Sequence, residues 1–270
     1  MARADVGSRA GADAVGINRR DGRASLADTR LNIDLTALGY AVLAGAANIL
    51  GAAAVTARTR WSESGLDALL AFSAGFMVSV GLLDLIPHAI EEGGSRAAFV
   101  VLLGYLLVHL TQHTLAPHFH FGEEKHAVTP AVGWSALAGL LLHTFIDGVA
   151  IASGFAVSSA LGILVFFAIL LHKIPEGVAI SSLFLAAGAG RTRAVTAATA
   201  LAAATVLGVL FTGIVEPLAE HGLALAGGVT LYVGASNLVP EFQAKPGWRL
   251  PVAFFAGCAI YLLARQLLPG

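Results

Sequence analysis

The chain has 270 residues, of which 57% are hydrophobic and 12% are charged, and its mean hydropathy is +0.78. Soluble domains carry about 25% charged residues, so this composition excludes an ordinary soluble protein and indicates one embedded in a membrane. The net charge of −1 gives no sign of a nucleic-acid partner. The single cysteine, Cys258, excludes an internal disulfide and a cluster of thiolate metal ligands.

Residues 1–34 differ from everything that follows them. They are rich in arginine and aspartate among alanines and glycines, and they lack the apolar core of a signal peptide. We therefore expect a disordered polar N-terminal tail.

Residues 35–268 predict one domain of eight transmembrane helices, because a spanning helix needs about 20 mostly apolar residues. The stretches that meet this requirement are 35–57, 68–90, 97–115, 131–155, 160–187, 194–215, 223–241 and 250–268. Abundant glycine and alanine favour close packing of helices in lipid. The expected fold class is an all-α polytopic membrane protein without an attached soluble domain.

The basic residues of the short loops predict how the helices are oriented. The loops after the first, third, fifth and seventh expected helices carry Arg58, Arg60, Lys125, Arg191, Arg193, Lys245 and Arg249. The opposite loops carry only Arg96. Because cytoplasmic loops are enriched in lysine and arginine, we expect both termini to lie outside.

A histidine-rich loop is expected on the cytoplasmic side at about 111–130. It contains His118, His120 and His126. Such a tract indicates weak, exchangeable metal binding. The alternative is a polar loop whose charge changes with pH.

Two matching motifs place ionisable residues in the middle of the fourth and fifth expected helices. HTFIDG (143–148) contains His143 and Asp147, and HKIPEG (172–177) contains His172 and Glu176. In each motif the imidazole and the carboxylate stand at positions i and i+4, so they share one helix face. Ionisable groups inside a membrane are costly and usually pair or bind something, and this set suits a borderline divalent cation. The alternative is that they only join helices through salt bridges and hydrogen bonds.

A second internal match involves the ends of the second and seventh expected helices. DLIPHAIE (84–91) contains Asp84 and His88, and SNLVPEF (236–242) contains Asn237 and Glu241. These two helices run in opposite directions in the expected topology. Because inverted repeats are typical of membrane transporters, we expect these residues along a transport pathway.

These motifs, in this order, resemble the ZIP (Zrt/Irt-like protein) family of divalent-metal transporters. The resemblance covers the whole expected membrane domain. It implies eight helices with inverted repeats (3+2+3), both termini outside, and a metal site between helices four and five. It further implies that the primary metal ligands are His143, Asp147, His172 and Glu176, with Met77 beside them.

In family members that bind two ions, further ligands stand at the positions of Thr144, Lys173 and Glu216. A protonated lysine has three N–H donors and no lone pair, so Lys173 cannot bind a metal in that form. We therefore expect a single ion, and we expect the Lys173 ammonium to neutralise a nearby carboxylate. The candidates are Asp147, Glu176 and Glu216. The alternative is that Lys173 extends toward a lipid headgroup.

The expected function is transport of a divalent transition-metal cation toward the cytoplasm by alternating access. Zn²⁺ is the favoured cargo, and Fe²⁺, Mn²⁺ and Cd²⁺ suit the same ligands. The metal is then the substrate, and no organic cofactor is expected. The other expected partners are the lipid bilayer and, as an open alternative to a monomer, a second copy of the chain. The arginine- and alanine-rich composition favours a bacterial inner membrane.

A membrane-embedded zinc-dependent hydrolase is the main alternative, because it would also need histidines and acids inside helices. It would further need an open coordination position, a water and a general base. The sequence contains no HExxH motif, and two near-identical half-sites leave no evident open position. A haem protein and a purely structural protein leave the repeated pairs unexplained. We therefore expect a transporter and not an enzyme.

Overall fold

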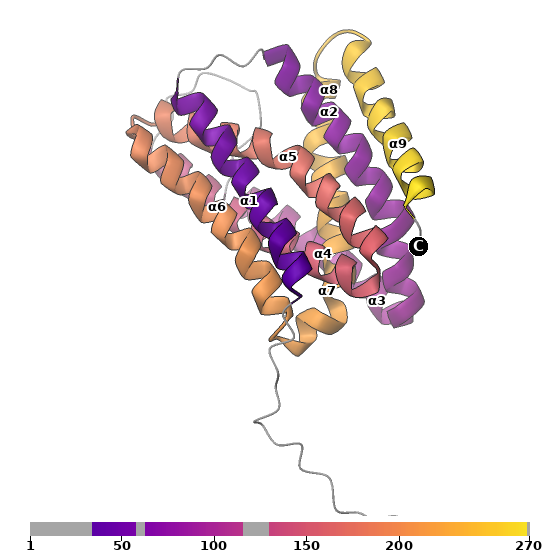
Figure 1. Ribbon diagram of the computed structural model, residues 1–270. Coiled ribbons are helices and arrows are strands. Elements are labelled where there is room, and N and C mark those ends of the chain that lie inside the picture. Colours follow the sequence, from indigo (N-terminus) through magenta and orange to yellow (C-terminus); the bar gives the residue numbers. More distant parts are fainter. Residues whose placement is uncertain (1–33, 58–62, 116–129, 269–270) are drawn as a thin grey trace, which may run out of the picture. The chain divides into compact units, whose positions relative to one another are not determined.

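The computed structural model describes residues 34–57, 63–115 and 130–268. Within these ranges every regular element is a helix (Figure 1). The elements are α1 (Leu35–Thr56), α2 (Glu63–Val80), the π-helix η2 (Gly81–Leu85), α3 (Ile86–Leu115), α4 (Pro130–Val157), α5 (Ser159–Ala186), α6 (Arg191–Thr212), α7 (Glu216–Leu231), the π-helix η3 (Tyr232–Leu238), α8 (Val239–Gln243) and α9 (Arg249–Leu267). The expected tail lies outside the described residues except for Asp34, whose side chain caps α1 by accepting the N–H of Thr36 at 2.8 Å.

Seven segments of the described chain are long and apolar enough to cross a membrane. One of them, Ser64–Gln112, joins α2, η2 and most of α3 into 49 residues. At about 1.5 Å per residue, this is more than twice the thickness of a hydrocarbon core of about 30 Å. Gly94 interrupts the segment with a φ of 57°, a conformation that glycine adopts without strain. This segment therefore contains both the second and the third expected helices.

The seventh expected helix starts earlier than its apolar stretch. It corresponds to α7, η3 and α8, and α7 begins at Glu216 and not near residue 223. Pro217 stands in the first turn, where its missing N–H has no helical partner to lose, and Glu216 supplies a negative charge at the helix N-terminus. The polar residues between the apolar stretches 194–215 and 223–241 therefore mark the start of a helix.

The outer faces of the helices carry large apolar side chains. Exposed examples are Leu43, Leu50, Phe99, Leu110, Phe255 and Leu263. Helix α9 exposes most of its residues, since only Gly257 and Tyr261 are buried in it. Exposed apolar surface on this scale matches a protein surrounded by lipid and not by water.

The helices form two groups. In one group α1 packs on α5 and on α6, and α4 packs on α5 and on α6; in the other α2 packs on α9 and α3 packs on α7 (Figure 1). Contacts of α4 with α7 and of α2 with α5 join the groups. The packing of α1 on α5 is matched by that of α6 on α4, and the packing of α2 on α9 by that of α7 on α3. The expected inverted repeat is therefore visible in the packing.

Glycines repeat at the equivalent helix crossings. A Cβ atom on Gly148 of α4 would lie 1.9 Å from the backbone oxygen of Thr205 on α6. In the same way, a Cβ atom on Gly177 of α5 would lie 2.1 Å from the backbone oxygen of Asn48 on α1. The same close approach to a facing carbonyl recurs at Gly51, Gly75, Gly104, Gly208, Gly228 and Gly257. Only glycine permits this spacing, which is how helices pack closely in lipid.

The repeat also extends through both π-helices in one register. Gly75, Gly81, Asp84, Leu85, Pro87 and Gly104 align without a gap with Gly228, Gly234, Asn237, Leu238, Pro240 and Gly257. Both π-helices end at the equivalent leucine, two residues before the equivalent proline. The short match between DLIP and NLVP is therefore part of a repeat that covers two helices on each side.

Candidate metal site

The four expected primary ligands come from α4 and α5, which pack against each other. His143 and Asp147 belong to α4, and His172 and Glu176 belong to α5; all four side chains are buried. Pro175 lies inside α5 without ending it. Each imidazole and its acid therefore keep the one-turn spacing that places them on one face.

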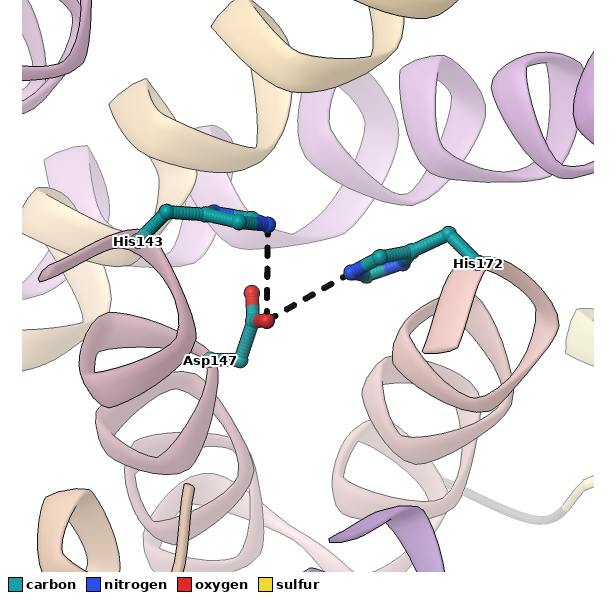
Figure 2. Close-up of side chains that lie close together, drawn as sticks. All are labelled: His143, Asp147 and His172. Atoms are coloured by element: carbon teal, nitrogen blue, oxygen red, sulfur yellow. Dashed lines mark hydrogen bonds and ion pairs between the residues drawn. The ribbon is translucent and has the colours of Figure 1, made fainter. Parts of the chain in front are cut away.

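Asp147 lies between the two imidazoles (Figure 2). Its Oδ2 atom is 3.5 Å from Nε2 of His143 and 3.4 Å from Nε2 of His172. One ligand atom from each of these residues lies within 4.8 Å of the others. Zinc binds nitrogen and oxygen at about 2.0–2.2 Å, so three donors at this separation can share one cation after small adjustments.

The hydrogen bonding of His172 prepares it to bind a cation. Its Nδ1 atom lies 3.0 Å from the carbonyl oxygen of Ala168. A carbonyl only accepts, so Nδ1 carries a hydrogen, and Nε2 is the ring atom left to bind a cation. Metal-binding histidines commonly donate their other N–H to a backbone carbonyl in this way. Nε2 faces Oδ2 of Asp147 at 3.4 Å, an arrangement that suits a cation between the two groups.

Glu176 has different partners. Its Oε1 atom accepts a hydrogen bond from the Thr144 hydroxyl at 2.7 Å, and its Oε2 atom lies 2.7 Å from Nζ of Lys173. The same Nζ atom lies 2.6 Å from Oδ2 of Asp147. Lys173 is 0% exposed, so it does not extend toward a lipid headgroup. Its ammonium stands between the two carboxylates of the site.

Comparison with known proteins identifies the family. A family model described as ZIP zinc transporter matches residues 122–264, a range that contains the α4–α5 site. The zinc transporter GufA of Myxococcus xanthus is 32% identical over an alignment 221 residues long, which covers 74% of this chain and 85% of that protein. The chain belongs to the ZIP zinc transporter family. The zinc transporter ZIPB of Bordetella bronchiseptica is 31% identical over an alignment 145 residues long, which covers 44% of each chain.

Membership in the ZIP family decides between the two functions considered for the sequence. Members of this family are transporters and not enzymes, so the hydrolase alternative is wrong. The chain is a multi-pass membrane protein that transports metal, with a divalent metal ion as its substrate.

Two residues that the ZIP resemblance placed at or near the site lie on other helices. Met77 of α2 is buried, and a Cβ atom on Gly234 of η3 would lie 3.3 Å from the Met77 Cβ atom. Glu216 is exposed in the first turn of α7. The contacts around Asp147 described above involve neither residue.

Asp84, expected on the transport pathway, is buried in η2 with two partners from α9. The Tyr261 hydroxyl donates a short hydrogen bond to Oδ2 of Asp84, and Nε of Arg265 lies 3.0 Å from Oδ1. His88 donates from Nδ1 to the backbone oxygen of Asp84 at 2.8 Å. Asp84 therefore joins η2 to α9. The sequence reasoning missed Tyr261 and Arg265, because only their chemical type, and nothing in their spacing, links them to a distant aspartate.

Asn237 and Glu241 are the equivalents of Asp84 and His88 in the other half of the repeat. Asn237 is half-buried in η3, and Glu241 is half-buried in α8. Next to Asn237, the hydroxyl of Ser236 lies 2.7 Å from that of Tyr105 and joins η3 to α3. The histidines expected to bind metal in the loop, His118, His120 and His126, lie outside the described residues.

One further polar residue was missed. Asn48 is fully buried on α1, where its backbone oxygen faces Gly177, the residue after Glu176. The sequence signal that could have found Asn48 is that it is the single amide side chain inside the apolar stretch 35–57.

Proposed function

We propose that this ZIP-family protein carries Zn²⁺ across a bacterial inner membrane toward the cytoplasm by alternating access. The observation that carries this proposal is the buried triangle of His143, Asp147 and His172. Imidazole and carboxylate ligands without thiolate suit Zn²⁺, and also Fe²⁺, Mn²⁺ and Cd²⁺. The names of both relatives, which are zinc transporters, favour Zn²⁺ among these.

In the proposed site Glu176 is the fourth ligand, and Lys173 replaces a second cation. The ammonium lies 2.6 Å from Asp147 and 2.7 Å from Glu176, which supports a charge-balancing role. A divalent ion that enters beside this ammonium is repelled by it at short range. The repulsion lowers the affinity for the ion, and a carrier needs moderate affinity in order to release its cargo.

The substitution Lys173→Asp tests the charge-balancing role. With an additional carboxylate beside Thr144 and Glu176, the variant should bind one metal ion more per chain than the parent. Equilibrium dialysis against Zn²⁺ followed by elemental analysis measures this. Lys245→Asp is the matched control, because Lys245 pairs with Asp67 outside the site. If Lys173→Asp binds no more metal than the parent, the charge-balancing role is wrong.

The proposed movement displaces the group of α1, α4, α5 and α6 against the group of α2, α3, α7 and α9. The inverted repeat supports it, because such repeats accompany rocking motions around a fixed site. Asp84 and His88 on one side, and Asn237 and Glu241 on the other, are the proposed pathway residues. Glu216 is proposed as an accessory carboxylate at the start of α7.

The proposed topology has eight crossings with both termini outside. The segment Ser64–Gln112 supplies two of the crossings, divided at Gly94. Arginines at the starts of α6 and α9 support a cytoplasmic position for those ends. The disordered tail at 1–34, metal binding by the loop at 111–130, and a homodimer stay predictions.

Uptake into proteoliposomes tests the function. Zn²⁺ is added outside, a fluorescent indicator is enclosed, and the parent is compared with His172→Ala. The variant should lose uptake, because the site loses one of its two imidazoles. The matched control is His221→Ala, which changes a half-buried histidine of α7 and should leave uptake intact. A folded parent that moves none of Zn²⁺, Fe²⁺, Mn²⁺ or Cd²⁺ would overturn the proposal.

A further inference from the structure

Asn48 is a buried amide without a partner. Its side chain is 0% exposed, and neither Oδ1 nor Nδ2 forms a hydrogen bond within the described parts of the chain. A buried polar group left unpaired costs about 1–3 kcal/mol. A leucine branches at the same carbon, is somewhat larger, and would avoid this cost in an apolar helix. An asparagine at this position therefore points to a ligand that the amide meets during function.

The position of Asn48 links it to the metal site. At the crossing of α1 and α5, a Cβ atom on Gly177 would lie 2.1 Å from the backbone oxygen of Asn48. Gly51 lies on the same face of α1 and meets the backbone oxygen of Ile174 in the same way. Helix α1 also contacts α4. The amide is thus buried where α1 packs against the helices that hold the metal ligands, beside the residue that follows Glu176.

The inverted repeat supplies an internal comparison. Thr205 of α6 is the equivalent of Asn48, because its backbone oxygen faces Gly148, the residue after Asp147. Thr205 is also 0% exposed, but its hydroxyl donates to the backbone oxygen of Leu201 at 3.4 Å. A buried polar residue therefore stands opposite the glycine that follows each acid of the site. The one beside Asp147 is bonded within its own helix, and the one beside Glu176 is not.

We propose that the Asn48 side-chain oxygen is a further ligand for the transported cation, on the Glu176 side of the His–Asp cluster. This side leads along α5 toward Arg191, the end that the proposed topology places in the cytoplasm. Amide oxygens bind divalent cations without adding charge. A neutral ligand at this place accepts the ion from Glu176 without holding it as strongly as a carboxylate does. The inference rests on the proposed function, and it adds α1 to the helices that bind the cargo.

The test uses Asn48→Leu, with Thr205→Val as the matched control at the equivalent position. Zn²⁺ uptake is measured in proteoliposomes, and thermal unfolding is measured in detergent. Asn48→Leu should lower the uptake rate about tenfold or more, the usual range for losing a group that supports a metal site. Its melting temperature should stay unchanged or rise, because the substitution removes an unpaired buried polar group. Thr205→Val should keep its uptake rate within about twofold of the parent, since its hydroxyl makes only a bond within its own helix.

A competition measurement separates cargo binding from a structural role. Mn²⁺ prefers oxygen ligands, whereas Cd²⁺ tolerates their loss better. In Asn48→Leu, Mn²⁺ should therefore become a weaker inhibitor of Zn²⁺ uptake relative to Cd²⁺ than it is in the parent. A structural defect lowers the rate without changing this ratio.

The outcomes are distinguishable. If the parent transports and Asn48→Leu matches it in rate and competition, the inference is wrong and the proposed function stands. If the variant loses uptake together with thermal stability and keeps the parent's ratio of Mn²⁺ to Cd²⁺ inhibition, Asn48 is structural and the inference is also wrong. If a folded parent does not transport, the proposed function fails first, and the inference fails with it.

Discussion

The α4 and α5 halves of the site have the same motif, but their acids have different partners. Asp147 of α4 faces the imidazoles of His143 and His172 and also the ammonium of Lys173. Glu176 of α5 faces the Thr144 hydroxyl and the same ammonium. Equivalent positions in the repeat therefore differ in their surroundings: the acid of α4 faces both imidazoles, and the acid of α5 faces a hydroxyl in their place.

The difference depends on the residue that follows each histidine. Thr144 on α4 reaches across to Glu176, and Lys173 on α5 reaches across to Asp147. The two contacts are equivalent in the repeat, because each joins the residue after one histidine to the acid of the other helix. One is made by a neutral hydroxyl and the other by a cation. The non-identical pair Thr144 and Lys173 thus gives the two halves different charges.

Removing each carboxyl charge in turn tests this comparison most strongly. Asp147→Asn should lower Zn²⁺ uptake by about 100-fold, and Glu176→Gln by about tenfold, the two ends of the range seen when a metal site is weakened. The larger loss is expected for Asp147 because it faces both imidazoles. Initial uptake rates in proteoliposomes measure both values. Equal losses would show that the two halves contribute alike.

The next largest effect is expected when the ammonium of Lys173 is removed. Lys173→Met leaves two buried carboxylates without their partner, and breaking such a pair costs about 3–5 kcal/mol. Thermal unfolding in the presence of a chelator should show this loss, and Zn²⁺ should restore more stability to the variant than to the parent.

Lys245→Met is the control for that measurement. Lys245 is 39% exposed in its pair with Asp67, and exposed pairs contribute about 0–1 kcal/mol. A melting temperature for Lys173→Met as high as that of this control would contradict the central position of the lysine.

The smallest effect is expected for the hydroxyl on the α4 side. Thr144→Val removes the donor to Glu176. An acceptor left unsatisfied lowers the free energy of unfolding by about 1–3 kcal/mol. Lys173 still holds Glu176, so uptake should fall by less than it does in Glu176→Gln. Thr199→Val is the control, because Thr199 is exposed and donates to the backbone oxygen of Val195 in its own helix. Uptake as low as that of Glu176→Gln would mean that Thr144 is itself a ligand.

The helices and the pairing of each histidine with its acid were predictable from local patterns. Apolar stretches of membrane-spanning length predict helices whatever surrounds them, and positions i and i+4 share a face in any helix. The second and third expected helices form one continuous segment that only Gly94 interrupts, although the sequence predicted two separate stretches. The start of α7 was placed too late, because its first turn is polar.

The partners of the buried charges were not predictable in the same way. Lys173 had several candidate carboxylates in the sequence; Glu176 lies one turn away on the same helix, but only the packing of α4 on α5 adds Asp147. Asp84 was assigned to a pathway, while the fold gives it Tyr261 and Arg265 from a helix far along the chain. Such contacts depend on how helices cross, and the spacing of residues within one helix contains no information about that.

The sequence by itself determined that this is an all-helical membrane protein with a duplicated His–acid motif, because hydropathy and helical periodicity are properties of contiguous residues. The tertiary structure decided which charges meet and which polar groups stay unpaired. It joined Asp147 to both imidazoles, placed the ammonium of Lys173 between two acids, and buried Asn48 without a partner. These outcomes depend on glycines that let helix backbones touch, since only at that separation do side chains from different helices share one site.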